Sequence, residues 1–275
     1  MLFLTHTPAL ALRSLVDHYF LMHIQVEKGA EPVLCPFPPT PLQFIVFYLD
    51  DLVITKKEGE GAFRRRGRCV VVGPQSTRMN LLVRESHRCF VIAFRPGGLY
   101  RLLGIPMQEL YDDGFEGADL VGSPIDRLTE QLLHTAQSTE MAQAADQWLL
   151  ERRHRIREAL PIDLALELLM QHDGHLSMEQ IASRACLSLR QFERKCTERI
   201  GYSPKFFARL SRFSRAYRLR EQHPGWNWTA IAHSSGYYDQ MHFIRDFKQF
   251  AGITPTGMQE LLRANPFPMQ APLKF

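Results

Sequence analysis

The chain has 275 residues, of which 45% are hydrophobic and 23% charged, and this composition excludes a disordered or fibrous protein. Its length favours two domains, and the net charge is +4. No uncharged apolar run approaches the length of a membrane span, and residues 1–4 lack the basic lead and cleavage site of a signal peptide. Five cysteines are an odd number without a CxxC pair, so we expect reduced thiols in the cytoplasm.

The first 94 residues predict a β-rich domain. Phe20, Met22, Ile24 and Val26 recur at every second position, as on one face of a strand. Residues 44–49 are an unbroken apolar run, typical of a strand buried on both faces. Further strands are expected at residues 52–55, 69–73, 79–83 and 89–94, with turn-rich segments at 36–41 and 59–61. Short strands at this spacing predict a small barrel or sandwich. Its interior is expected to be packed, although Phe44, Phe47, Tyr48 and Phe94 could instead line a pocket.

After residues 95–98 the pattern becomes helical. We expect helices at residues 99–103, 125–136 and 141–160. The last two either pair two subunits or pack against their own barrel, and the pattern favours neither arrangement. Pro161 closes this segment. We therefore expect an N-terminal domain at 1–160, a second domain at 161–265 and a tail at 266–275.

Residues 177–200 have the pattern of a helix-turn-helix. Ser177 with Gln180, and Ser188 with Gln191, form two capping boxes, in which each side chain accepts a backbone N–H of the other residue. The first box begins a short apolar helix at 178–185. In the following helix one stripe is apolar and predicts burial: Phe192, Cys196 and Ile200. Another stripe is polar: Arg190, Glu193, Arg194 and Thr197.

The segment after this unit predicts one long helix. Ser203 is an N-cap followed by Pro204 at the first helical position, and no helix breaker occurs before Pro224. Roughly 18 residues of helix would be about 27 Å long. Such a connector would hold two helices near one turn of DNA apart, about 34 Å.

The first unit then recurs. Phe192, Arg194, Gly201 and Pro204 are each matched by the same residue type 51 positions later, which indicates a duplicated supersecondary unit. In the second copy Asp239 is the expected N-cap. Three aromatics are expected to face inward: Phe243, Phe247 and Phe250. The equivalent outward stripe is Met241, Ile244, Arg245 and Lys248. One amphipathic helix of this kind would be an ordinary surface helix, but two in register favour insertion into the DNA major groove.

The charge of the chain is concentrated beside these helices. Residues 184–220 contain eleven Lys and Arg against two acidic residues, a local excess of +9. Residues 1–160 contain 18 basic and 19 acidic residues, a net charge of −1. A basic block next to a near-neutral domain is typical of a nucleic-acid binder, whereas alone it would also fit a solvated helix face.

Residues 163–263 resemble the DNA-binding domain of the AraC/XylS family of bacterial transcription regulators, which has two helix-turn-helix units joined by a long helix. The second unit is the more diagnostic, through Ile231-Ala232, Gly236-Tyr237, Asp239-Gln240, His242-Phe243, Arg245, Phe247-Lys248, Gly252 and Thr254-Pro255. The first unit departs twice from the family pattern: Cys186 stands at a usual glycine, and Cys196 at a usual aromatic. A smaller core and a less firmly seated reading helix are therefore expected in the first unit. Residues 94–99 resemble a subgroup whose N-terminal domain is uncharacterised.

The resemblance implies an α+β chain: a cupin-like N-terminal barrel with trailing helices, followed by an all-α reader. The expected function is sequence-specific binding of promoter DNA by a cytoplasmic, nucleoid-associated protein. Its expected partners are double-stranded DNA, RNA polymerase, a small-molecule effector and a second copy of the chain. We expect these residues to read bases: Arg190, Glu193, Arg194, Gln240, Met241, Ile244 and Arg245. We expect these to contact phosphates: Ser188, Lys195, His242 and Lys248.

Two enzyme alternatives make specific demands on the residues. A metal-dependent cupin needs clustered histidines and carboxylates, but His6, His18, His23 and His87 are scattered. An alkyl-transfer enzyme needs a cysteine activated by a base, and Cys186 has only Arg184 near it in sequence. No phosphate-binding loop or nucleophile-elbow motif occurs. We therefore expect neither catalysis nor a cofactor.

Overall fold

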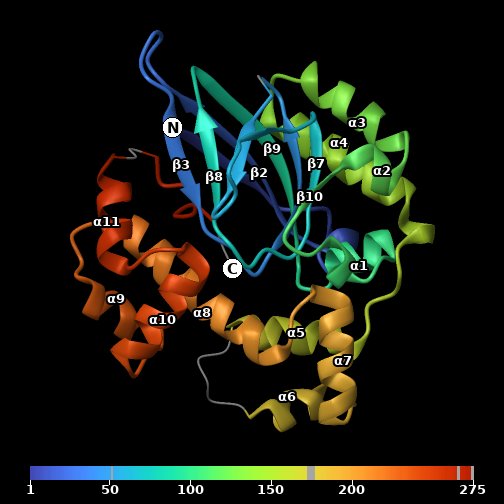
Figure 1. Ribbon diagram of the computed structural model, residues 1–275. Helices are drawn as coiled ribbons and strands as arrows, with labels where there is room; N and C mark the ends of the chain where they lie inside the picture. Colours follow the sequence, from blue (N-terminus) through green and yellow to red (C-terminus); the bar gives the residue numbers. More distant parts are fainter. Residues whose placement is uncertain (51, 172–176, 265–266, 274–275) are drawn as a thin grey trace.

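The computed structural model describes residues 1–50, 52–171, 177–264 and 267–273. Its N-terminal half contains two antiparallel sheets that face each other as an open barrel (Figure 1). The six-stranded sheet has the order β1-β2-β9-β4-β7-β10 and the four-stranded sheet the order β3-β8-β5-β6. The strands are β1 Leu2–His6, β2 Val16–Gln25, β3 Val33–Phe37, β4 Gln43–Tyr48, β5 Ile54–Lys57, β6 Arg64–Arg65, β7 Cys69–Val72, β8 Met79–Val83, β9 Ser86–Phe94 and β10 Gly114–Glu116.

The six-stranded sheet is apolar on both faces. Along β2, Phe20 and Met22 point into the barrel, whereas Tyr19 and Leu21 point to the outside, where helices cover them. The expected alternation of Phe20, Met22 and Ile24 is therefore confirmed, and so is the two-sided burial of β4. The four short strands β1, β3, β6 and β10 were not predicted.

Helices cover the outer face of this sheet. They are α1 Gly98–Leu103, α2 Gly117–Val121, α3 Pro124–Leu133 and α4 Ser138–Glu151. Ile125, Leu132 and Leu149 share one buried cluster with the outer face, so α3 and α4 pack on their own barrel. The expected extension of the last helix to residue 160 is wrong. It ends at Glu151, because a short 3-10 turn at Arg153–Arg155 follows and returns the chain to α1, where the Arg157 N–H donates to the Arg101 carbonyl at 3.0 Å.

The C-terminal half is all helical: α5 Pro161–Gln171, α6 Met178–Arg184, α7 Leu189–Ile200, α8 Pro204–Gln222, α9 Trp228–Ser234, α10 Gln240–Ala251 and α11 Pro255–Ala264. Both predicted capping boxes are formed, at Ser177 and Ser188. Asp239 caps α10 as expected, accepting from the backbone N–H of Met241. The connector α8 has 19 residues and follows the Ser203 cap and Pro204.

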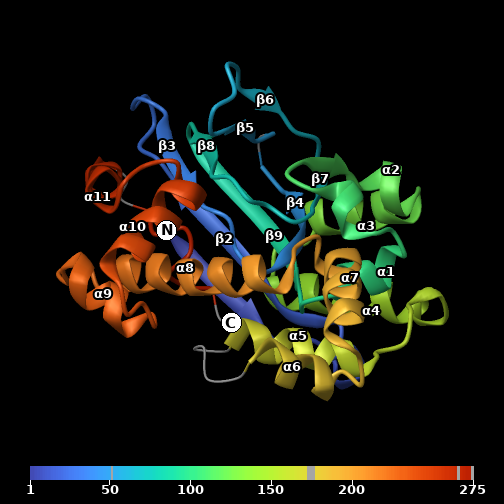
Figure 2. The ribbon, with the colours of Figure 1, turned by 60° about the horizontal axis from the view of Figure 1, so that its bottom comes forward.

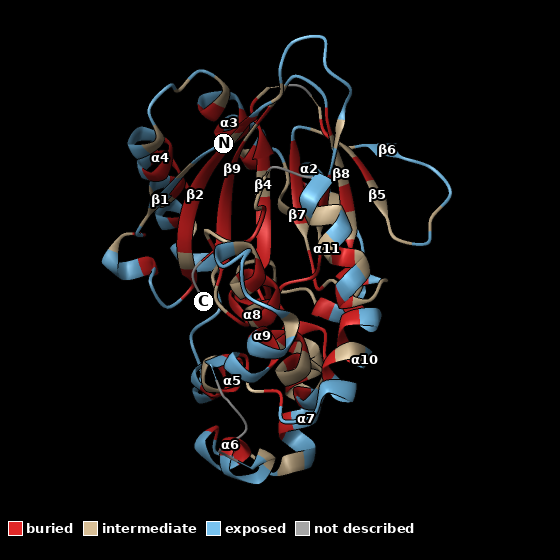
Figure 3. Ribbon diagram, turned by 90° about the vertical axis from the view of Figure 1, so that its left-hand side faces the viewer, coloured by how far each residue is buried: buried red, intermediate tan, exposed pale blue. Residues whose placement is uncertain are grey.

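The two halves share one hydrophobic core. It runs from the inner face of the six-stranded sheet through α8 to Phe250 in α10, and Figure 3 shows the buried positions following this path. Polar contacts cross the same junction. The Tyr202 hydroxyl donates to the Gln75 carbonyl at 2.7 Å, and Nε2 of Gln43 donates to the Ile200 carbonyl at 3.3 Å. In the described part of the chain no helix has the length and apolar character to cross a bilayer.

Candidate DNA interface and ligand cavity

The two predicted reading helices lie at opposite ends of α8. Figure 2 shows α7 and α6 beside one end of this helix and α9, α10 and α11 beside the other. At 1.5 Å per residue, the 19 residues of α8 are about 28 Å long, close to one turn of DNA. Each reading helix is preceded by a short helix and a tight turn, the layout of a helix-turn-helix.

The turns of the two units differ at one position. Cys186 has a φ of 56°, whereas Gly236 at the equivalent place has a φ of 80°. Both are left-handed conformations, which favour glycine because it lacks a Cβ. The first unit therefore carries some backbone strain at the position where the sequence departs from the family pattern.

The exposed side of α7 carries the predicted polar stripe. Arg190, Glu193 and Arg194 are exposed, whereas Thr197 is half-buried and its hydroxyl donates to the Glu193 carbonyl at 3.1 Å. On the other side Phe192, Cys196 and Ile200 are buried. The first half of α7 is thus free to approach a groove, while its last turn lies against the N-terminal domain.

The exposed side of α10 carries most of the second stripe. Gln240, Met241 and Arg245 are exposed, with 64% of Met241 accessible. Ile244 is half-buried and packs against the shared core, so its contact with a base would be limited to its outer edge. Phe243, Phe247 and Phe250 face inward as predicted.

The predicted phosphate contacts occupy different settings. Ser188 already accepts the Gln191 N–H as the cap of α7, and Lys195 is half-buried. His242 is exposed and lies 3.5 Å from Asp239, and Lys248 is exposed on the last turns of α10. Among the four, His242 and Lys248 are therefore exposed and have side chains that do not cap a helix.

Part of the basic block at residues 184–220 is used in folding. Arg199, Arg218 and Arg220 are buried, and Arg209 donates to Asp246 at 2.6 Å. Three of the eleven basic residues in this block are therefore internal, which composition alone could not reveal.

Sequence reasoning missed a groove between α8 and α10. It is lined by Arg209, Arg212, Tyr237, Tyr238, Asp239, His242, Arg245 and Asp246. Tyr238 is 88% exposed, and the Arg212 guanidinium lies 5.3 Å from the centre of the Tyr237 ring. The run Gly236-Tyr237-Tyr238 could have drawn attention to an exposed aromatic at the start of this helix.

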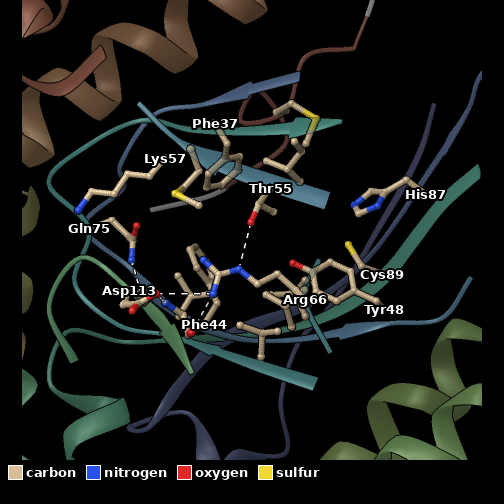
Figure 4. A pocket seen from close by; sticks show the side chains of 18 of the residues that line it. Phe37, Phe44, Tyr48, Thr55, Lys57, Arg66, Gln75, His87, Cys89 and Asp113 are labelled. Atoms are coloured by element: carbon tan, nitrogen blue, oxygen red, sulfur yellow. Dashed lines mark hydrogen bonds and ion pairs between the residues drawn. The ribbon is translucent and has the colours of Figure 1, made fainter. Parts of the chain in front are cut away.

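A second candidate site lies between the two sheets. It is a cavity of about 120 Å³ lined by side chains of both sheets (Figure 4). Phe44 and Tyr48 line it, whereas Phe47 and Phe94 belong to the core on the other face. The expectation of a packed barrel is therefore wrong, because the inner side chains of the two sheets pack together but leave a space of about 120 Å³ between them.

The cavity is polar at both ends and apolar between them. At one end Lys57 lies 3.1 Å from Asp112, and Arg66 lies 3.6 Å from Asp113. At the other end are Tyr48, His87 and Cys89 (Figure 4). Burial lowers the pKa of His87 to about 4 and raises the pKa of Cys89 to about 12, so both are uncharged at neutral pH.

The residues after α11 complete the cavity wall. Met269 is buried and lines the cavity, and Nε2 of Gln270 donates to the Pro38 carbonyl at 2.5 Å. The carboxylate of Glu221 in α8 accepts the backbone N–H groups of Met269, Gln270 and Ala271 at 3.2, 2.7 and 2.6 Å. Residues 267–273 thus form a strap, the tail strap, which joins the barrel to α8.

The strap makes stability depend on pH through Glu221. Burial raises the pKa of this carboxyl from 4.5 to about 7, so the folded state holds the proton more tightly than the unfolded chain. The stabilisation from protonation is therefore complete at low pH and is lost as pH rises from about 4.5 to about 7.

Between pH 5 and pH 8 we expect the free energy of unfolding of the unmodified protein to fall by on the order of 1–3 kcal/mol more than that of the Glu221→Gln variant, which has no carboxyl to titrate. Urea denaturation of both proteins across this range measures the difference. Parallel profiles for the two proteins would show that Glu221 does not titrate in this window.

The residues raised by the enzyme alternatives are not brought together. His6, His18, His23 and His87 lie on or beside β1, β2 and β9, and no group of three metal-binding side chains occurs among the described residues. Cys186 is exposed in its turn, with no ion pair or hydrogen bond of its thiol to a described residue.

Comparison with known proteins agrees with this layout. Residues 181–260 match the family described as "Helix-turn-helix domain", and residues 4–116 match a "Domain of unknown function (DUF6597)". No curated protein matches the chain.

Three solved structures show partial similarity. ToxT from Vibrio cholerae is 13% identical, with a TM-score of 0.49 over 94% of this chain and 98% of that chain. The DNA-binding domain of AdpA, solved in complex with a target DNA, is 22% identical, with a TM-score of 0.36 over 39% of this chain and 97% of that one. A DNA-binding transcriptional dual regulator from Escherichia coli K-12 is 25% identical, with a TM-score of 0.33 over 39% and 94%.

Two capped reading helices at the ends of one connector, beside a β-rich domain, define a DNA-binding transcription regulator with a double helix-turn-helix reader. The helix-turn-helix match at residues 181–260 covers most of the segment whose motifs resemble the reader of the AraC/XylS family.

Proposed function

We propose that this regulator reads two successive major-groove segments on one face of promoter DNA. The observation that carries the proposal is the placement of two exposed, N-capped helices at the ends of α8. Arg190, Glu193 and Arg194 would contact bases in one segment, and Gln240, Met241 and Arg245 in the next. Arginine favours guanine edges, and Glu193 can accept from a cytosine amine.

Phosphate contacts would fix the register of this complex. Lys248 and His242 are exposed beside the second reading helix, and Arg212 and Tyr238 line the adjacent groove. We include Arg212 and Tyr238 in the proposed phosphate-binding set, because contacts of this kind position a reader without carrying sequence information.

The first experiment is selection from a random DNA pool with the full-length protein. We expect an enriched motif with two short blocks about ten base pairs apart, one helical turn. Enrichment of a single block would mean that only one helix-turn-helix unit reads bases. If no motif were enriched, the proposal would be contradicted.

Replacing one residue of each kind separates reading from positioning. Arg194→Ala is expected to cost about 1–3 kcal/mol of binding free energy and to relax the preference at one base position. Lys248→Ala is expected to weaken all sequences alike and to reduce the slope of log affinity against log salt by about 1. Binding titrations against the selected site and its single-base variants measure both effects. If both substitutions weakened every sequence equally, the assignment of Arg194 to base reading would be wrong.

We further propose that the cavity of the β domain receives a small effector, so that this domain senses a molecule and does not convert one. The tail strap lines the cavity through Met269 and is bonded to α8 through Glu221, which supports coupling between an occupant and the reader. In keeping with the family, RNA polymerase and a second copy of the chain are further proposed partners, and the cytoplasmic nucleoid is the proposed location. Sedimentation of the full chain with and without operator DNA tests the homodimer.

A further inference from the structure

We propose that the cavity binds an uncharged molecule of about one ring that carries a single hydroxyl group, held between the imidazole of His87 and the hydroxyl of Tyr48. This inference rests on the sensing role proposed above and names the chemical class of its ligand.

The size of the cavity sets the size of the ligand. About 120 Å³ is comparable to engineered protein cavities of about 150 Å³ that accept benzene. The walls between the polar ends are apolar, with Phe20, Phe44 and Val91 from one sheet and Phe37, Met79 and Leu81 from the other. Burying the apolar body of a ring against such walls gives affinity without directional bonds.

The charged end of the cavity does not suit an anion. The guanidinium of Arg66 donates to the Thr55 hydroxyl at 3.0 Å and to the Gly114 carbonyl at 3.1 Å, and it lies near Asp113. Lys57 is paired with Asp112. The lining contains two cations, Lys57 and Arg66, and three carboxylates, Glu60, Asp112 and Asp113, so its formal charge is −1. A carboxylate ligand would have to displace these bonds and approach like charges.

The neutral end has unused hydrogen-bonding capacity. His87 is only 4% exposed, and its imidazole makes no hydrogen bond to a described residue. Burial keeps the ring neutral, because its pKa falls to about 4. A neutral imidazole has one nitrogen that accepts a hydrogen bond. A buried group of this kind is costly to leave without a partner.

Tyr48 supplies the complementary donor. Its ring centre lies 5.7 Å from that of His87, and its hydroxyl makes no hydrogen bond to a described residue. Burial raises the pKa of Tyr48 above its ordinary value, so the hydroxyl keeps its proton. A ligand hydroxyl matches both partners, because its proton can be donated to His87 while its oxygen accepts from Tyr48. Figure 4 shows these side chains gathered at the end of the cavity away from Lys57 and Asp113.

Methionines provide the reporters for a test on the full-length protein. Met22, Met79 and Met269 line the cavity, whereas Met241 is exposed on α10 and serves as the control. Methyl-labelled methionine spectra are recorded during titration with three probes of one ring: phenol, toluene and benzoate. We expect phenol to shift the three cavity methyls and not Met241, toluene to bind about tenfold more weakly, and benzoate to bind weakest.

Variants assign the hydrogen bonds. His87→Phe keeps a planar ring and removes the acceptor, and Tyr48→Phe removes only the donor. Each is expected to weaken phenol about tenfold and to leave toluene unchanged, a loss of about 1.4 kcal/mol. His23→Phe, on β2 outside the cavity lining, is the matched control and should leave both probes unchanged.

The outcomes distinguish this inference from the sensing role. Equal binding of phenol and toluene, or tighter binding of benzoate, would overturn the ligand class and leave the cavity as a sensor. If none of the three probes shifted a cavity methyl, the sensing role itself would fail.

Discussion

Replacing Arg199 with methionine is expected to lower the free energy of unfolding by about 3–5 kcal/mol. Nη1 of Arg199 donates to Oδ1 of Asp163 at 2.5 Å, and both side chains are buried. The guanidinium also lies 5.0 Å from the centre of the Tyr100 ring, at the junction of α7 with the N-terminal half. Methionine fills a similar volume but leaves the Asp163 carboxylate buried without its cation, and that desolvated charge causes the loss.

Two further variants show whether the loss comes from the buried charge. Arg194→Met, on the exposed side of the same helix, should change stability by no more than about 0.5 kcal/mol. Combining Arg199→Met with Asp163→Asn removes the uncompensated charge and retains an acceptor for the Leu160 N–H, so we expect most of the loss to be recovered. Urea denaturation measures all three proteins. A double variant no more stable than Arg199→Met would show that the guanidinium acts through packing instead of charge.

Replacing Phe247 with alanine is expected to cost about 3–5 kcal/mol, because it opens a cavity in the core of the second unit. Phe247 is fully buried, and its ring lies 5.1 Å from Phe213, 5.0 Å from Trp228 and 5.2 Å from Phe243. The loss should appear as a lower urea midpoint with an unchanged denaturant slope, and binding at the second operator block should weaken with it.

The first unit offers a control of matched position. Cys196 stands 51 residues before Phe247, on the equivalent turn of α7, and is equally buried. Cys196→Ala removes a single sulfur and should cost about 1 kcal/mol. If Phe247→Ala and Cys196→Ala lowered the free energy of unfolding by similar amounts, the larger aromatic core of the second unit would not make it more dependent on core packing than the first unit.

The duplicated reader was predictable because its signals are local. Capping boxes, an N-cap before proline and apolar stripes each act within one or two turns, and the helices begin where Ser177, Ser188, Ser203 and Asp239 indicate. The exposed stripe of α7 follows from the same periodicity. Sequence could not place Ile244, because its half-burial depends on the packing of α10 against the shared core.

The N-terminal half was predicted less completely because its contacts are between distant residues. Strand β1 pairs with β2 as an edge strand and carries no clear alternation, and β10 pairs with β7 across some 40 residues of chain. The position of the cavity was also not predictable, because both faces of β4 are apolar and the sequence does not show which of them meets the four-stranded sheet. The carboxylate of Glu221 meets the tail strap only through the tertiary fold, since 48 residues separate it from Met269.

The shared core means that the β domain and the helical reader are not interchangeable parts. A cut near residue 160 would uncover apolar side chains on the inner sheet and along α8 at once, because each covers the other. A hybrid that joins this β domain to a reader from another regulator would inherit an apolar face with no matching cover, and we expect it to aggregate. A functional hybrid would have to carry α8 and residues 267–273 together with the barrel. The two halves can therefore be exchanged between regulators only together.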